Sequence, residues 1–263
     1  MLIYLNQLFE RGLQYRSINV ARSGLSTFLK ICSNIEINTH EEVTRFMKGV
    51  FQSRPALPRY SKTWDVKIVL NYLEALQNTS LFQISCKIAM LFLLLSAQRC
   101  QTLHLIEMAD VEIEENQLRI FPNHLLKQSK PGKHLDVMVF KSIKNEKLCI
   151  VKTMLEYLER TEHLRNGTKL FISTIKPHNS VSKDTIARWI KYVMEKAGIG
   201  KGFKPHSTRA ASTSKAKQSG VTIQTIIKTA GWANAKVFTK HYNMPIVQTD
   251  TKTVQEAVLE ETE

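Results

Sequence analysis

The chain has 263 residues, of which 43% are hydrophobic, so it can bury a sizeable core in one or two domains. Its most apolar run, residues 88–97, is about half the length of a membrane span, and its four cysteines lack metal-ligand spacing. The formal net charge of +14 favours a polyanionic partner, either a nucleic acid or an anionic membrane surface.

The positive charge is distributed unevenly along the chain. Residues 196–249 contain nine Lys or Arg and no Asp or Glu, and residues 1–62 and 117–152 also have an excess of basic side chains. Residues 63–116 differ, with three basic and seven acidic side chains. Basic segments around an acidic, apolar centre indicate a folded body that binds an elongated anion. The alternative is a basic surface that only keeps the protein soluble.

The N-terminal part of the chain predicts a small helical domain. Apolar periodicity indicates helices over residues 2–15, 17–31 and 40–51. Pro55 and Pro58 then prevent a helix from continuing, in a segment where basic residues crowd together. We therefore predict a basic linker at 55–62 between a domain of residues 1–54 and a larger domain of residues 63–249.

The larger domain is predicted to be mainly α with a small antiparallel β-sheet, an α+β fold. Alternating apolar residues indicate a hairpin over residues 111–121 and a strand over 133–140 with Leu135, Val137 and Val139 on one face. The predicted helices cover residues 63–76, 81–97, 148–158, 182–197, 206–219, 221–230 and 234–242.

Two features of the acid-free segment indicate a phosphate site. His206 and Arg209 follow Pro205 at an expected helix start, and their separation of three places both side chains on one face. A guanidinium matches two phosphate oxygens. Tyr242, flanked by Lys240 in the same positive field, is a candidate for an activated phenol. The alternatives are a chance spacing for the first pair and an amphipathic core edge for the tyrosine.

Two further basic elements precede this segment. Arg99 directly follows the most apolar helix, so its guanidinium must either form an ion pair, with Glu107 or Asp110, or face a cleft. The sequence Pro131-Gly132 predicts a tight turn between strands. Three lysines surround this turn: Lys127, Lys130 and Lys133. Such a lysine can reach into a groove and donate a proton, or it can be a solvated surface residue.

The order of these elements resembles the tyrosine recombinase family, to which phage integrases belong, over residues 60–250. The order is an arginine, a hairpin lysine in QSKPG, the HxxR pair, a tryptophan 26 residues after the histidine, and a tyrosine ten residues later. The resemblance implies six catalytic positions: Arg99, Lys130, His206, Arg209, Trp232 and Tyr242.

The resemblance also implies a mechanism. Tyr242 would attack a DNA phosphodiester, giving a 3′-phosphotyrosyl link and a free 5′-hydroxyl, and a second strand would then reverse the step. Neither ATP nor a metal or other cofactor is implied. The implied partners are double-stranded DNA and further copies of the chain, as a tetramer on paired sites, and no membrane.

The N-terminal domain is similar in kind to the family's helical core-binding domain. That similarity makes Arg22 a candidate contact to the DNA backbone, together with Arg54, Arg59 and Lys62 around the linker. The segments AQRCQTLHL and GW…HY resemble recombinases of eukaryotic DIRS-type and Crypton-type mobile elements. This branch implies the nucleus as the location; in a bacterium it would be the cytoplasm and nucleoid.

The chain departs from the family pattern at two points. Thr102 stands where the family usually has an acidic residue, three positions after its first arginine, and the interval from Trp232 to Tyr242 is one residue longer than the commonest. The runner-up hypothesis is therefore a weakened or domesticated DNA-binding protein derived from a recombinase. A membrane-binding or RNA-binding helical protein would explain the charge alone. The acidic tail, residues 250–263, is expected to dock on a neighbouring protomer or to fold back on its own domain.

Overall fold

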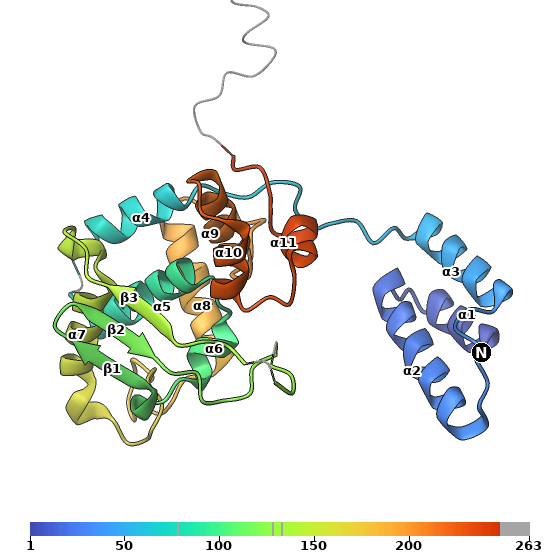
Figure 1. Ribbon diagram of the computed structural model, residues 1–263, viewed down its shortest axis with the longest axis horizontal. Helices are drawn as coiled ribbons and strands as arrows, with labels where there is room; N and C mark the ends of the chain where they lie inside the picture. The colour runs from blue at the N-terminus through green and yellow to red at the C-terminus, as the bar shows by residue number, and fades with distance from the viewer. Residues whose placement is uncertain (78, 128, 133, 248–263) are drawn as a thin grey trace, which may run out of the picture. The chain divides into compact units, whose positions relative to one another are not determined.

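The computed structural model describes residues 1–77, 79–127, 129–132 and 134–247. The chain divides into two compact units, Met1–Tyr60 and Ser61–Glu263 (Figure 1). The predicted acidic tail and Lys133 lie outside the described residues.

The first unit contains three helices, α1 (Leu2–Glu10), α2 (Tyr15–Ser33) and α3 (Glu41–Ser53), which share one small core. The buried members of this core are Leu5, Leu8, Ile18, Val43, Met47 and Val50. The first helix ends before the predicted residue 15 because Gly12 has a φ of +84°, which a right-handed helix does not allow.

The second unit is built around α5 (Leu81–Ser96), which packs against α7 (Ile150–Thr161), α8 (Lys183–Lys196) and α9 (Ser207–Gln218). Most side chains of α5 are buried, as its apolar sequence predicts, because a helix that is apolar on all sides is stable only in an interior. In the described ranges, no helix is both long and apolar enough to cross a membrane.

The other helices of this unit are α4 (Val66–Ala75), α6 (Cys100–Leu105), α10 (Ile223–Ala230) and α11 (Ala235–His241). The helix predicted from residue 63 begins at Val66 because the Asp65 carboxylate accepts a hydrogen bond from the Lys67 N–H at 2.9 Å and caps it. Thr63 instead pairs with Ile246, which follows α11. Short 3₁₀ turns cover Met108–Asp110, Glu146–Leu148 and Glu162–Leu164.

The sheet is antiparallel, with the order β1 (Val111–Glu114), β2 (Gln117–Ile120), β3 (Met138–Lys141). The predicted third strand is too long. Ile120, the last residue of β2, pairs with Met138, so residues 134–137 have no strand partner. The core face of β3 consists of Met138 and Phe140, whereas Val139 is 49% exposed. The predicted fold class, mainly helical with a small antiparallel sheet, is confirmed.

The start of α5 generates the first prediction. The Ser80 hydroxyl accepts a hydrogen bond from the Gln83 N–H, and the Gln83 side chain accepts one from the Ser80 N–H, both at 3.2 Å. Ser80→Ala should therefore lower the free energy of unfolding by about 1 kcal/mol in denaturant titrations. Ser219→Ala, at the exposed end of α9, is the matched control and should change it by less than about 0.5 kcal/mol. Equal effects of the two changes would contradict this role of Ser80.

Candidate active site

The segment before α9 places His206 at the surface and Arg209 in the interior. Ser207, the first residue of α9, accepts a hydrogen bond from the Trp64 indole at 2.9 Å, and the Thr208 hydroxyl donates to the Pro205 carbonyl at 2.8 Å. These bonds fix the start of the helix. His206 is consequently exposed, whereas the Arg209 side chain is 0% exposed.

Arg209 is a buried cation with unused hydrogen-bond donors. Its Nη2 donates to the Ala230 carbonyl, but its Nε and Nη1 have no hydrogen-bond partner among the described residues. Burial, and then the nearby charge of Arg99, lower the pKa of Arg209 to about 9, so it remains charged at neutral pH. Two free donors on a buried guanidinium are a binding site for an anion such as phosphate.

The C-terminal end of α10 organises the surrounding residues. The last four carbonyls of a helix lack partners within it. Here two are satisfied by backbone N–H groups of the following turn, in which Gly231 has a φ of 67°. The next two, of Thr229 and Ala230, accept from the side chains of Gln98, at 2.8 Å, and Arg209. The end of one helix thus binds two distant side chains.

Trp232 follows this turn and contacts two other predicted site residues. Its indole ring is stacked on the Tyr242 ring, with 4.6 Å between centroids, and the guanidinium carbon of Arg209 lies 4.7 Å from the indole centroid. Ala97 and Phe238 belong to the same buried cluster. The tryptophan therefore holds the tyrosine ring beside the buried cation.

Tyr242 lies at the end of α11 with its hydroxyl oxygen 3.0 Å from Nε2 of His206. Its position is fixed by Ser214, whose hydroxyl donates to the Tyr242 carbonyl at 2.6 Å and accepts from the Met244 N–H at 3.0 Å. The structure thus brings His206, Arg209, Trp232 and Tyr242 together, although the sequence separates them by up to 36 residues.

His206 lies in a strongly positive environment. Partial burial, followed by the charges of Arg99, Arg209 and Lys127, lowers the pKa of His206 to about 4. The imidazole is therefore neutral at neutral pH. If Tyr242 donates its proton, Nε2 must be the unprotonated nitrogen, which can act as a base.

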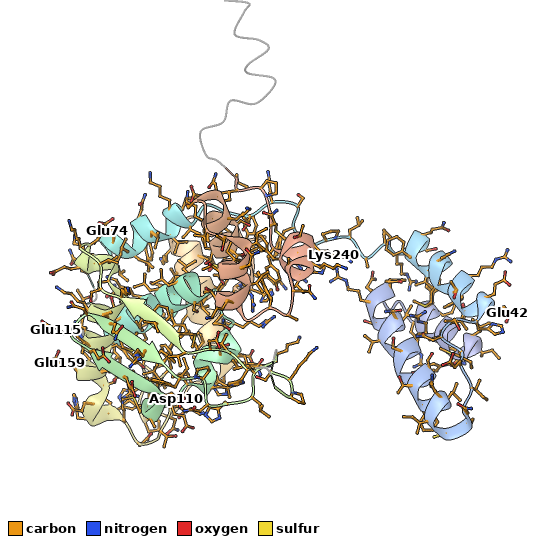
Figure 2. The ribbon with its side chains drawn as sticks, in the orientation of Figure 1. Glu42, Glu74, Asp110, Glu115, Glu159 and Lys240 are labelled. Atoms are coloured by element: carbon orange, nitrogen blue, oxygen red, sulfur yellow. The ribbon has the colours of Figure 1, made fainter. Side chains whose placement is uncertain are left out.

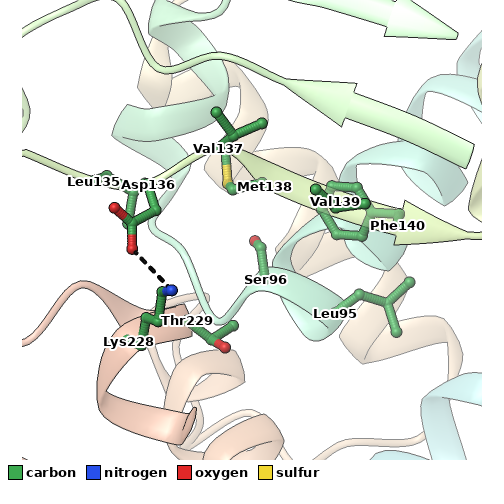
Figure 3. Close-up of a pocket in the computed structure, with 10 residues that line it drawn as sticks. All are labelled: Leu95, Ser96, Leu135, Asp136, Val137, Met138, Val139, Phe140, Lys228 and Thr229. Carbon is green, nitrogen blue, oxygen red and sulfur yellow. Dashed lines mark ion pairs between the residues drawn. The ribbon is translucent and has the colours of Figure 1, made fainter.

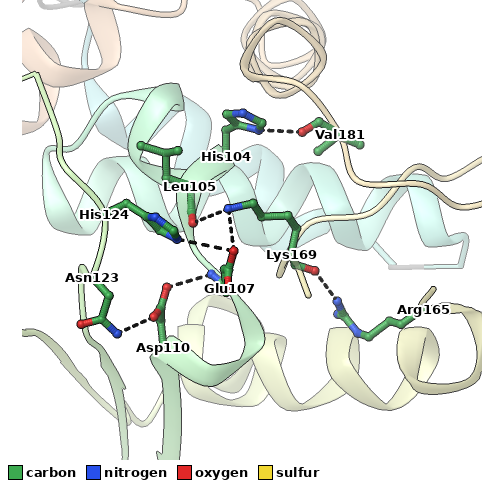
Figure 4. Close-up of polar contacts among 9 residues, drawn as sticks. All are labelled: His104, Leu105, Glu107, Asp110, Asn123, His124, Arg165, Lys169 and Val181. Carbon is green, nitrogen blue, oxygen red and sulfur yellow. Dashed lines mark hydrogen bonds and ion pairs between the residues drawn. The ribbon is translucent and has the colours of Figure 1, made fainter. Parts of the chain in front are cut away.

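Glu107 and Asp110, the alternative ion-pair partners of Arg99, bond to other residues (Figure 4). The Glu107 carboxylate bonds to Lys169 at 3.0 Å and lies 3.5 Å from His124. The Asp110 carboxylate accepts from the Asn123 amide at 2.6 Å and from the Glu107 N–H at 2.9 Å. Both carboxylates thus have other partners, and the charge of Arg99 acts on His206 and Arg209.

The lysine loop between β2 and β3 extends from the sheet toward the side of the unit that carries α11 (Figure 1). Lys127 and Lys130 are both exposed. Lys127, not Lys130, is among the charges that lower the pKa of His206. In this conformation the structure therefore brings Lys127 toward the histidine, whereas sequence reasoning selected Lys130.

Polar contacts hold both ends of this loop. The bonds to Asn123 and His124 tie the end that leaves β2 (Figure 4). Before β3, the Asp136 carboxylate lies 3.6 Å from the Lys228 ammonium of α10, across a cavity of about 220 Å³ (Figure 3). The loop is therefore attached both to the sheet and to the helix that precedes Trp232.

The other predicted anion contacts lie in or near the first unit. Arg59 and Lys62 are exposed, whereas Arg22 is half-buried beside a hollow between α2 and α3. Arg54 donates to the carbonyls of Phe9 and Leu13 at 2.7 and 2.9 Å. The Arg54 guanidinium thus links α3 to the end of α1 within the first unit.

The acidic residues Glu74, Glu115 and Glu159 lie on the side opposite Lys240 of α11 (Figure 2). Within the described residues, no group of three or more His, Cys, Asp or Glu side chains could hold a metal ion. Sequence reasoning gave no role to Gln98, a buried residue directly before Arg99 whose side chain donates to the Thr229 carbonyl at the end of α10.

The second prediction concerns the titration of His206. In an NMR titration of the free protein, its imidazole should remain neutral at about pH 6, where an ordinary histidine is largely protonated. Arg99→Ala should raise the pKa, because it removes one of the positive charges that disfavour the imidazolium. A midpoint near about 6.5 in both proteins would contradict the proposed environment.

The chain is similar to known proteins over most of its length. The model of the "Phage integrase family" matches residues 65–248. No curated relative matches the chain significantly. Three similar solved structures are the XerH site-specific recombinase bound to a palindromic difH substrate, the Tn1549 transposon integrase in complex with circular intermediate DNA, and a lambda integrase dimer bound to a core site.

The match to the XerH structure has a TM-score of 0.64 and 15% sequence identity, and it covers 100% of this chain and 71% of the XerH chain. The match to the transposon integrase has a TM-score of 0.59 and 16% identity, and it covers 100% of this chain and 83% of the integrase chain. The match to lambda integrase has a TM-score of 0.55 and 17% identity, and it covers 96% of this chain and 81% of the integrase chain. At these identities the likeness shows the fold. The family model covers more than half of the chain, and this protein therefore belongs to the phage integrase family of tyrosine recombinases.

Proposed function

We propose that this protein is a site-specific DNA recombinase whose nucleophile is Tyr242. The observation that carries the proposal is the hydrogen bond of 3.0 Å between the Tyr242 hydroxyl and Nε2 of His206, beside a buried guanidinium with two free donors. A nucleophile, a base and an anion site within one cluster are the components that attack on a phosphodiester requires.

The first step exchanges one phosphodiester for another. The phenol oxygen attacks the phosphorus as its proton passes to His206, and the bond from phosphorus to the 5′ oxygen breaks. The products are a 3′-phosphotyrosyl link and a free 5′-hydroxyl. Attack by another 5′-hydroxyl then reverses the step, so the energy of the bond is retained and neither ATP nor a metal is needed.

The arginines stabilise the charge that develops during this exchange. Nε and Nη1 of Arg209 have no hydrogen-bond partner among the described residues and are the donors proposed for the phosphate, and Arg99 adds a second cation. The bond to Ala230 fixes the guanidinium before DNA binds, but because Arg209 is fully buried, the side chains that cover it must move before a phosphate can reach these donors.

The departing 5′ oxygen needs a proton, and the loop between β2 and β3 supplies the donor. The resemblance of QSKPG to the family's lysine segment favours Lys130, whereas the charge acting on His206 is that of Lys127. We propose Lys130 as the acid, with a movement of the loop when DNA binds; Lys127 is the alternative.

DNA is the proposed partner on both units. In the second unit, a hollow of about 330 Å³ beside Arg99 and His206 is also lined by Lys183 and Lys204, which suits a nucleic acid backbone. The first unit would act as the core-binding domain through its exposed basic residues, and four copies would assemble on paired sites. We place the chain with the DIRS-type and Crypton-type mobile-element recombinases, hence in a nucleus, on its short sequence similarities.

The third prediction tests the nucleophile. Tyr242→Phe should abolish denaturant-resistant adducts with a labelled, nicked duplex library of random sequence, while DNA affinity stays within about twofold, because the phosphate site is intact. Tyr192→Phe removes the same oxygen from α8, away from the site, and should form adducts like the wild type. Adducts formed by Tyr242→Phe would remove Tyr242 from the mechanism.

The fourth prediction identifies the acid. Lys130→Ala should cleave ordinary DNA slowly, by about 10²-fold or more, and recover on DNA whose 5′ bridging oxygen is sulfur, because a thiolate needs little protonation to leave. Lys127→Ala is the matched control from the same loop. Rescue of Lys127→Ala alone would transfer the role to Lys127.

A further inference from the structure

The turn that joins α5 to α6 is packed against the part of the unit that bears the nucleophile. Ala97, at the end of α5, is 3% exposed and has a φ of 52°, an uncommon value for a residue other than glycine. It shares a buried cluster with Ala230 of α10, Trp232 and Phe238 of α11. Any movement of this turn would therefore change where Arg99 lies relative to Tyr242.

Gln98 makes the polar connection across this contact. Its side chain is 1% exposed, and its Nε2 donates to the Thr229 carbonyl at 2.8 Å and to the Ser96 carbonyl at 3.4 Å. Its Oε1 accepts from the Thr102 hydroxyl at 3.4 Å. One buried amide thus joins α5, α6 and the end of α10, directly before Arg99 in the chain.

The chemistry of this connection requires a donor, not a carboxylate. The C-terminal end of a helix carries partial negative charge. The two groups that face Gln98 Nε2 are carbonyl oxygens, which accept hydrogen bonds and cannot donate one to a carboxylate. A carboxylate at position 98 would be repelled by both. A neutral amide donates to both carbonyls, and its oxygen accepts a hydrogen bond from the hydroxyl of Thr102, which is 4% exposed.

This neutrality also preserves the positive charge of the site. An acid buried at position 102, one helical turn from Arg99, would offset part of the charge that Arg99 presents to a phosphate. The pair of Gln98 and Thr102 fixes the turn without adding a negative charge.

We propose that Gln98 is a positioning residue, which holds Arg99 in place against the end of α10 and so against Trp232 and Tyr242. With Thr102 it takes the place of the acidic residue that the family usually has at position 102. The catalytic consequence of this inference rests on the proposed recombinase function, but the placement of Arg99 does not.

The first experiment uses the free protein and needs no cleavage. Gln98→Met keeps the size of the side chain and removes its hydrogen bonds. If Gln98 positions Arg99, the NMR midpoint of His206 in Gln98→Met should move upward, toward its value in Arg99→Ala. A midpoint that stays at the wild-type value in Gln98→Met, while Arg99→Ala shifts it, overturns the proposal.

The second experiment measures single-turnover cleavage of a nicked duplex. Gln98→Met should lower the rate by about ten- to a hundredfold, as expected for a catalytic group that is slightly misplaced, with DNA affinity within about threefold. In an Arg99→Ala background the same change should cause no further loss, because Gln98 acts through Arg99. Equal losses in both backgrounds overturn the proposal.

A stability control separates positioning from general loosening. Tyr157→Phe also removes buried hydrogen bonds, to the Leu170 carbonyl at 3.2 Å and from the Ile172 N–H at 3.1 Å, but far from the site in sequence and in α7. It should cleave like the wild type well below its melting temperature, and a loss equal to that of Gln98→Met overturns the proposal. If the wild type forms no adduct, the recombinase function fails, and the titration still decides the role of Gln98.

Discussion

A buried guanidinium held by a backbone carbonyl is the constraint on which the rest of this site depends. An ion transferred from water to a protein interior is unfavourable by several kcal/mol unless it is paired and hydrogen-bonded. Arg209 is 0% exposed, and in the described structure it is bonded only through Nη2, to Ala230. The negative end of α10 supplies part of the compensation. The remainder is uncompensated in the described structure, which is the reason to propose that an anion binds there.

The end of α10 gives that cation its neighbours. The carbonyl before Ala230 binds Gln98, and the turn after it places Trp232 against both the guanidinium of Arg209 and the ring of Tyr242. The eight-residue helix α10 thus sets the positions of side chains from separate segments of the chain, namely Gln98, Arg209, Trp232 and Tyr242. At identities of 15 to 17%, the similar recombinase structures share the fold of this chain. The hydrogen bonds of Gln98 and Arg209 to the end of α10 are made to backbone carbonyls, which do not change with the sequence, whereas Trp232 contacts side chains.

The sequence predicted the parts of this arrangement that follow from periodicity or from residue order. The apolar run of α5 and the hairpin follow from spacing alone. The spacing of His206 and Arg209 predicted a shared helix face, but His206 precedes α9 and is exposed, whereas Arg209 is buried within it. The role of Gln98 could not be predicted, because its partner Thr229 lies 131 residues away and glutamine carries no distinctive signal. The predicted start of β3 was wrong because the length of this strand is set by its partner β2, which ends at Ile120. The choice between Lys127 and Lys130 depends on the conformation of a loop, which spacing does not determine.

The departure at Thr102 acquires a physical meaning from this charge distribution. Burial, and then repulsion by the charges of Arg99, Arg209 and Lys127, lowers the pKa of His206 and keeps its imidazole neutral. A phosphodiester placed among them adds one negative charge and so reduces the local positive field. In the proposed mechanism, the imidazolium that forms when Tyr242 loses its proton is therefore less disfavoured while DNA is bound. A buried acid at position 102 would weaken that contrast by compensating the cations in advance. In the proposed mechanism, the neutral contact of Thr102 with Gln98 therefore leaves the basicity of His206 dependent on the phosphate, which favours activation of Tyr242 in the complex with DNA.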